Sequence, residues 1–193
     1  MPRHKQFDQD DALQKAMEVF WSRGFEATSI QDLVANMGIN RQSLYDTYGD
    51  KHALFLLALD RYREVEGRRL IELLERPGSL KKSLRQLFRE VVEKALCDRE
   101  RRGCFMGNAT SELAGRCKET ASRTSRNMAT IEQAFYRALL RAKQEGEIEG
   151  VCDSRAMARF FYCMLQGIVM MAKARQDRKA LNDVVRVTLS VLD

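Results

Sequence analysis

The chain of 193 residues has few of the residues that interrupt helices and no long apolar run. It contains two prolines, Pro2 and Pro77, and no Asn-Gly or Asp-Gly pair of the kind that closes a β-hairpin. No stretch approaches the roughly 20 consecutive apolar residues that a membrane-spanning helix needs. The N-terminus is polar and lacks the apolar segment of a signal peptide. These absences favour a mostly helical protein and predict a cytoplasmic location without a membrane partner.

Residues that carry catalytic chemistry are also scarce. The chain has two histidines, His4 and His52, and neither lies in a recognisable motif. It has no glycine-rich phosphate loop and no cluster with the spacing of metal ligands. Its five cysteines are odd in number and include no Cys-x-x-Cys pair, which argues against a disulfide framework and against a zinc site. We therefore expect no enzyme activity, no cofactor, no metal and reduced thiols.

The formal net charge of +6 suggests a nucleic-acid partner, but its distribution weakens that argument. Residues 1–63 contain 8 Lys and Arg against 9 Asp and Glu, so that segment has a net charge of −1. The positive excess lies in residues 64–193. The case for DNA binding must therefore rest on local pattern.

Hydrophobic residues make up 45% of the chain, enough for a globular core, and their spacing predicts nine helices. Leu13, Met17 and Phe20 follow the three- and four-residue spacing of a helical face, and Gly24 follows where that helix should end. The expected N-caps include Asp8 or Asp10, Thr28 or Ser29, Asn40, Asp50 and Ser154. The first three expected helices run from Asp8 or Asp10 to Gly24, from Thr28 or Ser29 to Gly38, and from Asn40 to Gly49. The other six cover approximately residues 51–75, 79–97, 104–114, 119–146, 154–174 and 179–192.

Residues 28–51 have the pattern of a helix-turn-helix. A helix of about two turns is followed by Gly38, which supplies the positive φ angle of a tight turn, and by Ile39, which fills the angle between the helices. The next helix is capped by Asn40 and begins with polar side chains. A recognition helix is built in this way because its N-terminal residues enter the major groove.

This segment resembles the TetR family of transcriptional regulators. The family pattern has a Thr-capped helix, a glycine turn and a polar helix start that leads into Leu-Tyr-x-x-Phe-x-x-Lys. Residues 44–51, Leu-Tyr-Asp-Thr-Tyr-Gly-Asp-Lys, follow it with Tyr48 in place of Phe. Residues 23–29 also look like the family's turn between its first two helices. The resemblance is specific over about residues 10–60; beyond them the length, the helix order and the final helix pair agree.

The resemblance implies an all-α fold with a helix-turn-helix DNA-binding domain over residues 1–50 and a ligand-binding and dimerisation domain over residues 51–193. It also implies a homodimer that represses transcription by binding double-stranded operator DNA and that responds to a small-molecule effector.

Residue types and the resemblance together indicate the contacts with DNA. Arg pairs with guanine and Gln with adenine in bidentate geometry, so the start of the recognition helix is expected to read bases. Hydroxyls and lysines around it are expected to contact phosphates, which position the protein, and Arg3 and Lys5 to add electrostatic affinity or to follow the minor groove. The base-contact candidates are Arg41, Gln42 and Ser43, and the phosphate-contact candidates are Thr28, Tyr45, Tyr48 and Lys51.

Asp46 places an acid on the same helix, near the expected phosphates. It repels the DNA backbone unless Arg41 or Lys51 compensates, or unless it accepts a hydrogen bond from a cytosine amino group. The sequence leaves these alternatives open.

The last two expected helices have broad apolar faces that would leave a large exposed patch on a monomer. In the TetR-like fold the matching pair packs against its mate as a four-helix bundle, and the alternative is a core within one chain. The dimer-interface candidates are Met157, Met164, Ile168, Val184, Val185 and Thr188.

The helices between these two parts are expected to surround a ligand pocket, although an apolar stripe at helical spacing also suits an ordinary core. Methionine suits such a pocket because it adapts to varied ligands. The candidates for the lining are Phe88, Val92, Cys104, Phe105, Met106, Leu113, Met128, Phe135 and Phe161.

Cys104 is the candidate for a chemical sensor. It follows several arginines and begins an expected helix, and both features favour the reactive thiolate. Residues 103–108, Gly-Cys-Phe-Met-Gly-Asn, resemble a Gly-Cys element in a branch of TetR-like proteins, some of which sense electrophiles or oxidants. The alternative is a small structural residue at a helix start.

The predicted function is therefore a DNA-binding regulator that a small-molecule or thiol-reactive signal releases from its operator. The alternatives are a helical small-molecule carrier and a protein-interaction adaptor, neither of which would bind DNA specifically. The net charge of −1 over residues 1–63 is the feature that favours these alternatives.

Overall fold

The computed structural model describes residues 7–149 and 153–192, and the regular structure within them is entirely helical. The segment from α4 to α5 continues through one π-helical turn without a break, so the described chain forms nine helical rods, as the sequence predicts. Their bounds are α1 Gln9–Arg23, α2 Ile30–Met37, α3 Arg41–Tyr48, α4 Lys51–Tyr62, the π-helix Arg63–Gly67, α5 Arg68–Glu75, α6 Leu80–Cys97, α7 Phe105–Leu113, α8 Lys118–Gln144, α9 Ser154–Ala174 and α10 Arg178–Ser190.

Side-chain caps determine most helix starts. Asp8 rather than Asp10 caps α1, and Ser29 rather than Thr28 caps α2. Ser29 and Asp32 form a reciprocal capping box, in which each side chain accepts a hydrogen bond from the other residue's backbone amide. The Ser29 hydroxyl, which donates to Asp32 Oδ2 at 2.6 Å, together with the Ser29 amide and with Arg23 at 2.5 Å, lowers the pKa of Asp32 to about 2.

The predicted cap of α9 is wrong by one residue. Asp153 accepts the hydrogen bond from the Arg155 amide, and Ser154 is the first residue of the helix and is buried. Both side chains are good caps, and the position that remains exposed takes the role.

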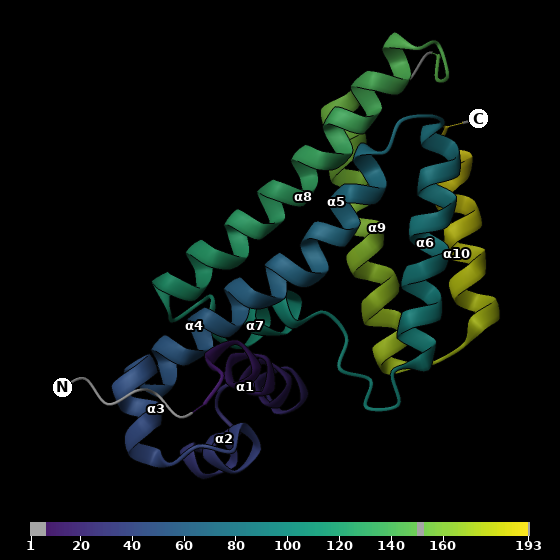
Figure 1. Cartoon of the computed structure of the whole chain (residues 1–193). Coiled ribbons are helices and arrows are strands. Elements are labelled where there is room, and N and C mark those ends of the chain that lie inside the picture. Colours follow the sequence, from purple (N-terminus) through teal and green to yellow (C-terminus); the bar gives the residue numbers. More distant parts are fainter. Residues whose placement is uncertain (1–6, 150–152, 193) are drawn as a thin grey trace.

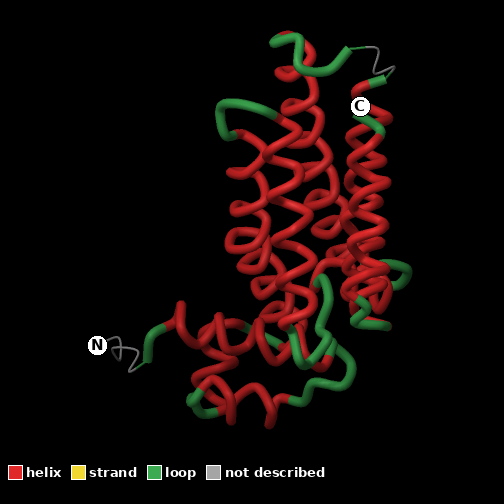
Figure 2. The backbone as a smooth tube through the Cα atoms, turned by 90° about the vertical axis from the view of Figure 1, so that its right-hand side faces the viewer, coloured by secondary structure: helices red, strands yellow, loops and turns green. Residues whose placement is uncertain are grey.

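The molecule has a compact head at one end of a longer helical body (Figures 1 and 2). Helices α1–α3 form the head, which carries the described N-terminal end of the chain. The rod of α4 and α5 runs out of the head beside α8, and α9 lies between that pair and α6 and α10. Within the described residues, no helix combines the length and the apolarity needed to cross a membrane.

Two hydrophobic cores correspond to these two parts. The head core joins α1–α4 to α7, and its rings of Phe20, Phe55 and Phe105 pack edge to face. The body core joins α5, α6, α8, α9 and α10, with Phe161 between Phe88 and Phe135. The head core therefore crosses the predicted domain boundary at residue 50, because α4 and α7 complete it. That boundary remains a prediction.

Candidate functional site

Helix α3 presents its polar first turn to solvent. Arg41 and Gln42 are exposed and Ser43 is half-buried, whereas Leu44 is completely buried against the head core. Asn40 caps the helix by accepting a hydrogen bond from the Ser43 amide at 2.8 Å. The sequence thus builds a short helix that is anchored by one apolar face and free on the other.

The exposed face of α3 has two side-chain pairs, each spanning one turn. Arg41 Nη2 lies 3.4 Å from the Tyr45 hydroxyl, with its guanidinium over the Tyr45 ring. Gln42 Nε2 donates to Asp46 Oδ1 at 2.8 Å. The sequence left open whether Arg41 or Lys51 compensates the charge of Asp46. In the structure, the hydrogen-bond partner of Asp46 is Gln42.

Two predicted phosphate contacts instead have their hydroxyls directed into the protein. Thr28 is 1% exposed, and its hydroxyl donates to the Gly24 carbonyl oxygen at 2.6 Å. Tyr48 is 8% exposed, and its hydroxyl donates to the Gln9 carbonyl oxygen at 3.0 Å. Burial and the charges of Asp10 and Asp8 raise the pKa of Tyr48. In this conformation neither hydroxyl is available to a phosphate.

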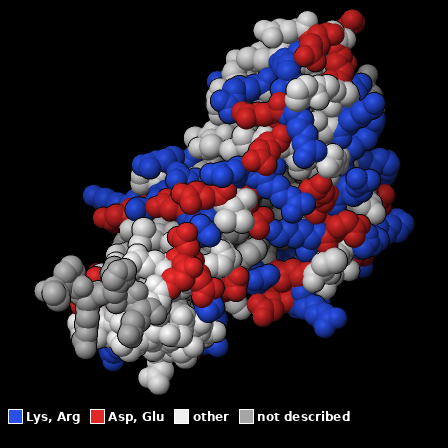
Figure 3. Space-filling model, viewed as in Figure 1, with Lys and Arg blue, Asp and Glu red and all other residues white. Residues whose placement is uncertain are grey.

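The other two predicted phosphate contacts are accessible. Tyr45 is 37% exposed, and Lys51 is half-buried with its ammonium 4.4 Å from the centre of the Phe25 ring, a cation–π contact. Lys and Arg gather over the body, while the surface over α1–α3 is mostly uncharged in the view of Figure 3. Residues 9–48 contain only the cations Lys15, Arg23 and Arg41, so these individual positions matter.

The outer face of α9 and α10 is apolar and exposed in the single chain. Met171, two turns after Met164 on α9, is 41% exposed, and Val187 of α10 is 57% exposed. A groove between the two helices is lined partly by Phe160, Met164 and Val187.

The predicted interface residues divide between this face and the interior. Met157, Met164, Val184 and Val185 are half-buried. Ile168 is completely buried and Thr188 is 1% exposed, with its hydroxyl bonded to the Val184 carbonyl. Ile168 belongs to the body core. Its predicted place at the dimer interface is wrong, because its side chain does not reach the surface of the chain.

A cavity of about 370 Å³ lies where the head meets the body. Its wall combines aromatic, apolar and charged groups, including an ion pair between Lys94 and Glu66 at 2.5 Å. Such a mixture and volume suit a small organic ligand. The wall includes Trp21 of α1, Tyr62 of α4, Glu66 and Gly67 of the π-helix, Val91 and Cys97 of α6, Ile131 of α8 and Tyr162 of α9, together with Arg102, Gly103 and Cys104 of the loop before α7.

Of the nine residues predicted to line a pocket, Cys104 alone lies on the wall of this cavity. The other eight do not lie on this wall, because apolar spacing reports burial and not the neighbour against which a residue is buried. Phe88, Val92, Phe135 and Phe161 fill the body core, Phe105, Met106 and Leu113 fill the head core, and Met128 is 42% exposed.

Cys104 caps α7 through its sulfur, which accepts from the Gly107 amide at 3.4 Å. Burial and the neighbouring Cys104 raise the pKa of the Tyr62 hydroxyl well above its ordinary value. The same two causes, burial first, raise the pKa of Tyr162 to about 12. The Tyr62 and Tyr162 hydroxyls near this thiol therefore stay neutral.

Trp21 connects this wall to the head. Its indole Nε1 donates to the Gly103 carbonyl oxygen at 2.9 Å, and Arg102 lies over its ring at 4.2 Å. The Tyr62 ring packs edge to face against it at 5.1 Å. Sequence reasoning missed Trp21 and Tyr62 because no local signal connects Trp21 with a loop 82 positions away.

Comparisons with known proteins agree with this architecture. The family described as bacterial regulatory proteins of the tetR family matches residues 12–58, and the tetracyclin repressor-like C-terminal domain matches residues 80–188. The chain is 44% identical to the HTH-type transcriptional regulator YezE of Bacillus subtilis over 100% of both chains. It is 31% identical to the HTH-type transcriptional repressor ComR of Escherichia coli, over 97% of this chain and 90% of that one.

Among solved structures, the chain is similar to the TetR family regulator CifR, in a form with three cysteine substitutions bound to 26-base-pair double-stranded operator DNA. The TM-score is 0.85 and the identity 32%, over 99% of this chain and 100% of the other. The reduced form of E. coli NemR, 16% identical, has the same fold with a TM-score of 0.85 over 93% of each chain.

Proposed function

The chain belongs to the TetR family of bacterial transcriptional regulators, and from this premise we propose that it is a repressor that binds operator DNA as a homodimer and leaves it when its cavity is occupied or Cys104 is modified. The observation that carries the proposal is the exposed polar start of α3, supported from below by the buried Leu44. The structure of CifR on operator DNA supports the same use of this fold.

On this proposal Arg41, Gln42 and Ser43 contact base edges, and Tyr45 and Lys51 contact phosphates. Thr28 and Tyr48 support these contacts indirectly. The Thr28 hydroxyl stabilises the turn before α2, and the Tyr48 hydroxyl ties α3 to the start of α1.

Asp46 acts in this proposal as a positioning residue for Gln42. An adenine is read by one amide hydrogen and the carbonyl oxygen of a glutamine. Because the Gln42 nitrogen already donates one hydrogen to Asp46, its second hydrogen and its oxygen are left in a defined orientation. This role explains why an acidic residue stands on a helix that faces DNA, and it requires no direct contact between Asp46 and a base.

The homodimer is supported by the apolar face of α9 and α10, which includes Met164, Met171 and Val187. A second copy covers such a face symmetrically. Two recognition helices can then meet successive major grooves, about 34–36 Å apart.

The signal enters through the cavity between head and body. Tyr62 and Cys104 lie on its wall. Trp21 of the head donates a hydrogen bond to Gly103, in the loop that precedes Cys104 and α7. A ligand that fits one position of this loop better than another shifts the population of head orientations and so changes DNA affinity. A reagent that adds to the Cys104 sulfur inside the wall has the same effect, because the adduct occupies cavity volume.

The test is binding of the purified protein to the DNA upstream of its own gene, measured at two salt concentrations. We expect sequence-dependent binding by a dimer that weakens as salt rises, because phosphate contacts release counterions. If that DNA binds no better than random DNA, selection from random sequences follows. Failure to enrich any sequence would contradict the repressor and favour the carrier or the adaptor.

A further inference from the structure

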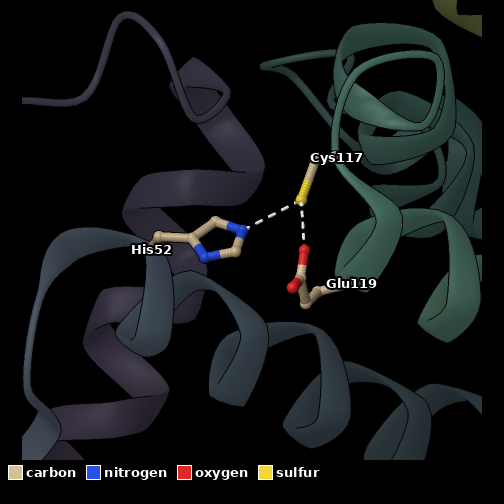
Figure 4. A group of neighbouring side chains, drawn as sticks. All are labelled: His52, Cys117 and Glu119. Atoms are coloured by element: carbon tan, nitrogen blue, oxygen red, sulfur yellow. Dashed lines mark hydrogen bonds between the residues drawn. The ribbon is translucent and has the colours of Figure 1, made fainter.

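His52, Cys117 and Glu119 lie together at the junction of the head and the body (Figure 4). His52 is in the first turn of α4, directly after the recognition helix, while Cys117 and Glu119 stand at the start of α8. The His52 nitrogen, the Cys117 sulfur and a Glu119 carboxylate oxygen all lie within 4.8 Å of one another. Among the residues that the structure describes, this is the one such group of three potential metal ligands.

The two distances from the Cys117 sulfur are close to those of a tetrahedral zinc site. His52 Nε2 lies 3.1 Å from Cys117 Sγ, and Cys117 Sγ lies 3.5 Å from Glu119 Oε2. With metal–sulfur bonds of about 2.3 Å and metal–nitrogen or metal–oxygen bonds of about 2.0–2.1 Å, the ligand atoms of a tetrahedron are roughly 3.5 Å apart. The nitrogen–sulfur distance needs to open by only about 0.4 Å.

The sulfur is held in place by its own helix. Cys117 caps α8, and its Sγ accepts from the Thr120 amide at 3.4 Å and from the Thr120 hydroxyl at 3.2 Å. Thr120 is completely buried, so these donors form a rigid support of the kind that orients metal ligands from behind. His52 is supported in turn by the Phe25 ring, which packs edge to face against the imidazole.

Access and donor chemistry indicate which ion fits. His52 and Cys117 are half-buried and Glu119 is exposed, which leaves a solvent side for entry and for a water ligand. Imidazole and thiolate are ligands of zinc-class metals, whereas calcium and magnesium prefer oxygen alone. The thiol loses its proton when the metal binds.

We propose that His52, Cys117 and Glu119 bind one divalent cation of the zinc class, with water in the fourth position. Bound there, the ion joins the first turn of α4, directly after the recognition helix α3, to the first turn of α8, whose later turns belong to the body core. It stabilises the arrangement of head and body in which the three ligands meet. The site is separate from the cavity, because none of its three ligands lies on the cavity wall.

The first experiment uses the full chain, reduced and stripped with a chelator, and titrates it with Co²⁺, whose absorption reports tetrahedral thiolate coordination. We expect one Co²⁺ per chain with a sulfur-to-cobalt band that Zn²⁺ displaces. Cys117→Ser should lose the band. Cys104→Ser is the matched control, because Cys104 also caps a helix through its sulfur. It should keep the band, because Cys104 is not one of the three ligands. Absence of the band in the unsubstituted protein, or its survival in Cys117→Ser, overturns the site.

The second experiment measures the melting temperature with and without Zn²⁺. The unsubstituted protein should melt higher with Zn²⁺, and His52→Gln should weaken Zn²⁺ affinity by at least about tenfold while keeping the circular dichroism of a folded protein. Glu119→Gln, an exposed substitution with little risk to folding, should also weaken it. Equal Zn²⁺ responses in all three proteins would show that the ion binds elsewhere.

Discussion

The head and the body are both helical and both centred on phenylalanine rings, yet they differ in how completely they are packed. In the head, Phe55 contacts Phe20, Phe25 and Phe105 at centroid distances of 5.0–5.7 Å. The body is packed around Phe161 but leaves a cavity of about 370 Å³ at its edge toward the head. A filled core holds α3 in one geometry, whereas the cavity is the place where, on the proposed function, a ligand changes how the two parts sit. Helix α7 connects them, since its Phe105 belongs to the head core and Cys104 before it lies on the cavity wall.

The largest effect that tests this comparison is expected from Phe105→Ala. Although Phe105 lies far from the head in sequence, it is 1% exposed and contacts Phe55 and Tyr62 in the head core. Truncating a buried phenylalanine costs about 3–5 kcal/mol of unfolding free energy. Urea unfolding should register this loss, while the exposed Met128→Ala should change stability by less than about 0.5 kcal/mol. Similar losses in both variants would refute the assignment of α7 to the head core.

Arg41→Ala tests the exposed side of the head. It should remove about 1–3 kcal/mol of discrimination at one base pair of the operator. Lys51→Ala should instead weaken binding to all DNA sequences alike and reduce the salt dependence of the DNA affinity. Competition binding with single-base operator variants separates the two behaviours, and unchanged preference in Arg41→Ala would exclude Arg41 from base recognition.

Cys104 tests whether the cavity controls the head. Alkylation of the protein should weaken operator binding by about tenfold or more, which corresponds to a coupling free energy in the range of about 1–3 kcal/mol. Cys104→Ser should be insensitive to the reagent. Cys163→Ser, an exposed thiol away from the cavity wall, should respond as the unsubstituted protein does. A full response in Cys104→Ser would assign the sensitivity to another thiol.

Asp46→Asn should have a smaller effect and sharpens the account of α3. The neutral amide holds Gln42 less firmly than the carboxylate does, so preference at the base pair read by Gln42 should fall by less than tenfold. Affinity for random DNA should rise slightly, because one charge that repels phosphates is gone. Loss of affinity for all sequences would instead indicate that Asp46 supports the fold of the head.

The smallest effect is expected from the capping box of α2 and depends on pH. The pKa of Asp32 is lowered to about 2 in the folded protein, below its ordinary value of 3.8. The bonds of Asp32 therefore stabilise the fold above pH 3.8, and this contribution is lost as pH falls toward 2. The difference in unfolding free energy between the unsubstituted protein and Asp32→Asn should be constant from pH 7 to about 5 and shrink below about 4. If this difference in unfolding free energy stays the same down to pH 2.5, it does not come from the ionised Asp32.

The sequence predicted well whatever depends on neighbours a few positions apart. Gly38 and Asp50 ended and began helices where expected, since a positive φ angle and a side-chain cap are local requirements. The exposed start of α3 was also foreseeable, because Asn40 caps it and polar residues follow. These signals were sufficient for the nine helices and for the helix-turn-helix.

Predictions that required knowledge of a distant neighbour fared less well. Phe88 and Phe135 were correctly expected to be buried, but apolar spacing does not distinguish a core from a cavity wall. Tyr48 has the sequence position of a phosphate contact, and only packing against α1 directs its hydroxyl to the Gln9 carbonyl.

By itself, then, the sequence determined the helices, several of their caps and the polar face of α3, because hydrogen bonding and side-chain periodicity within a helix act over a few residues. The tertiary structure decided which residues surround the cavity, how Trp21 meets Gly103 and where His52 meets Cys117. Those contacts join segments 65 and 82 positions apart, and their geometry follows from how whole helices pack, a property that no local pattern contains.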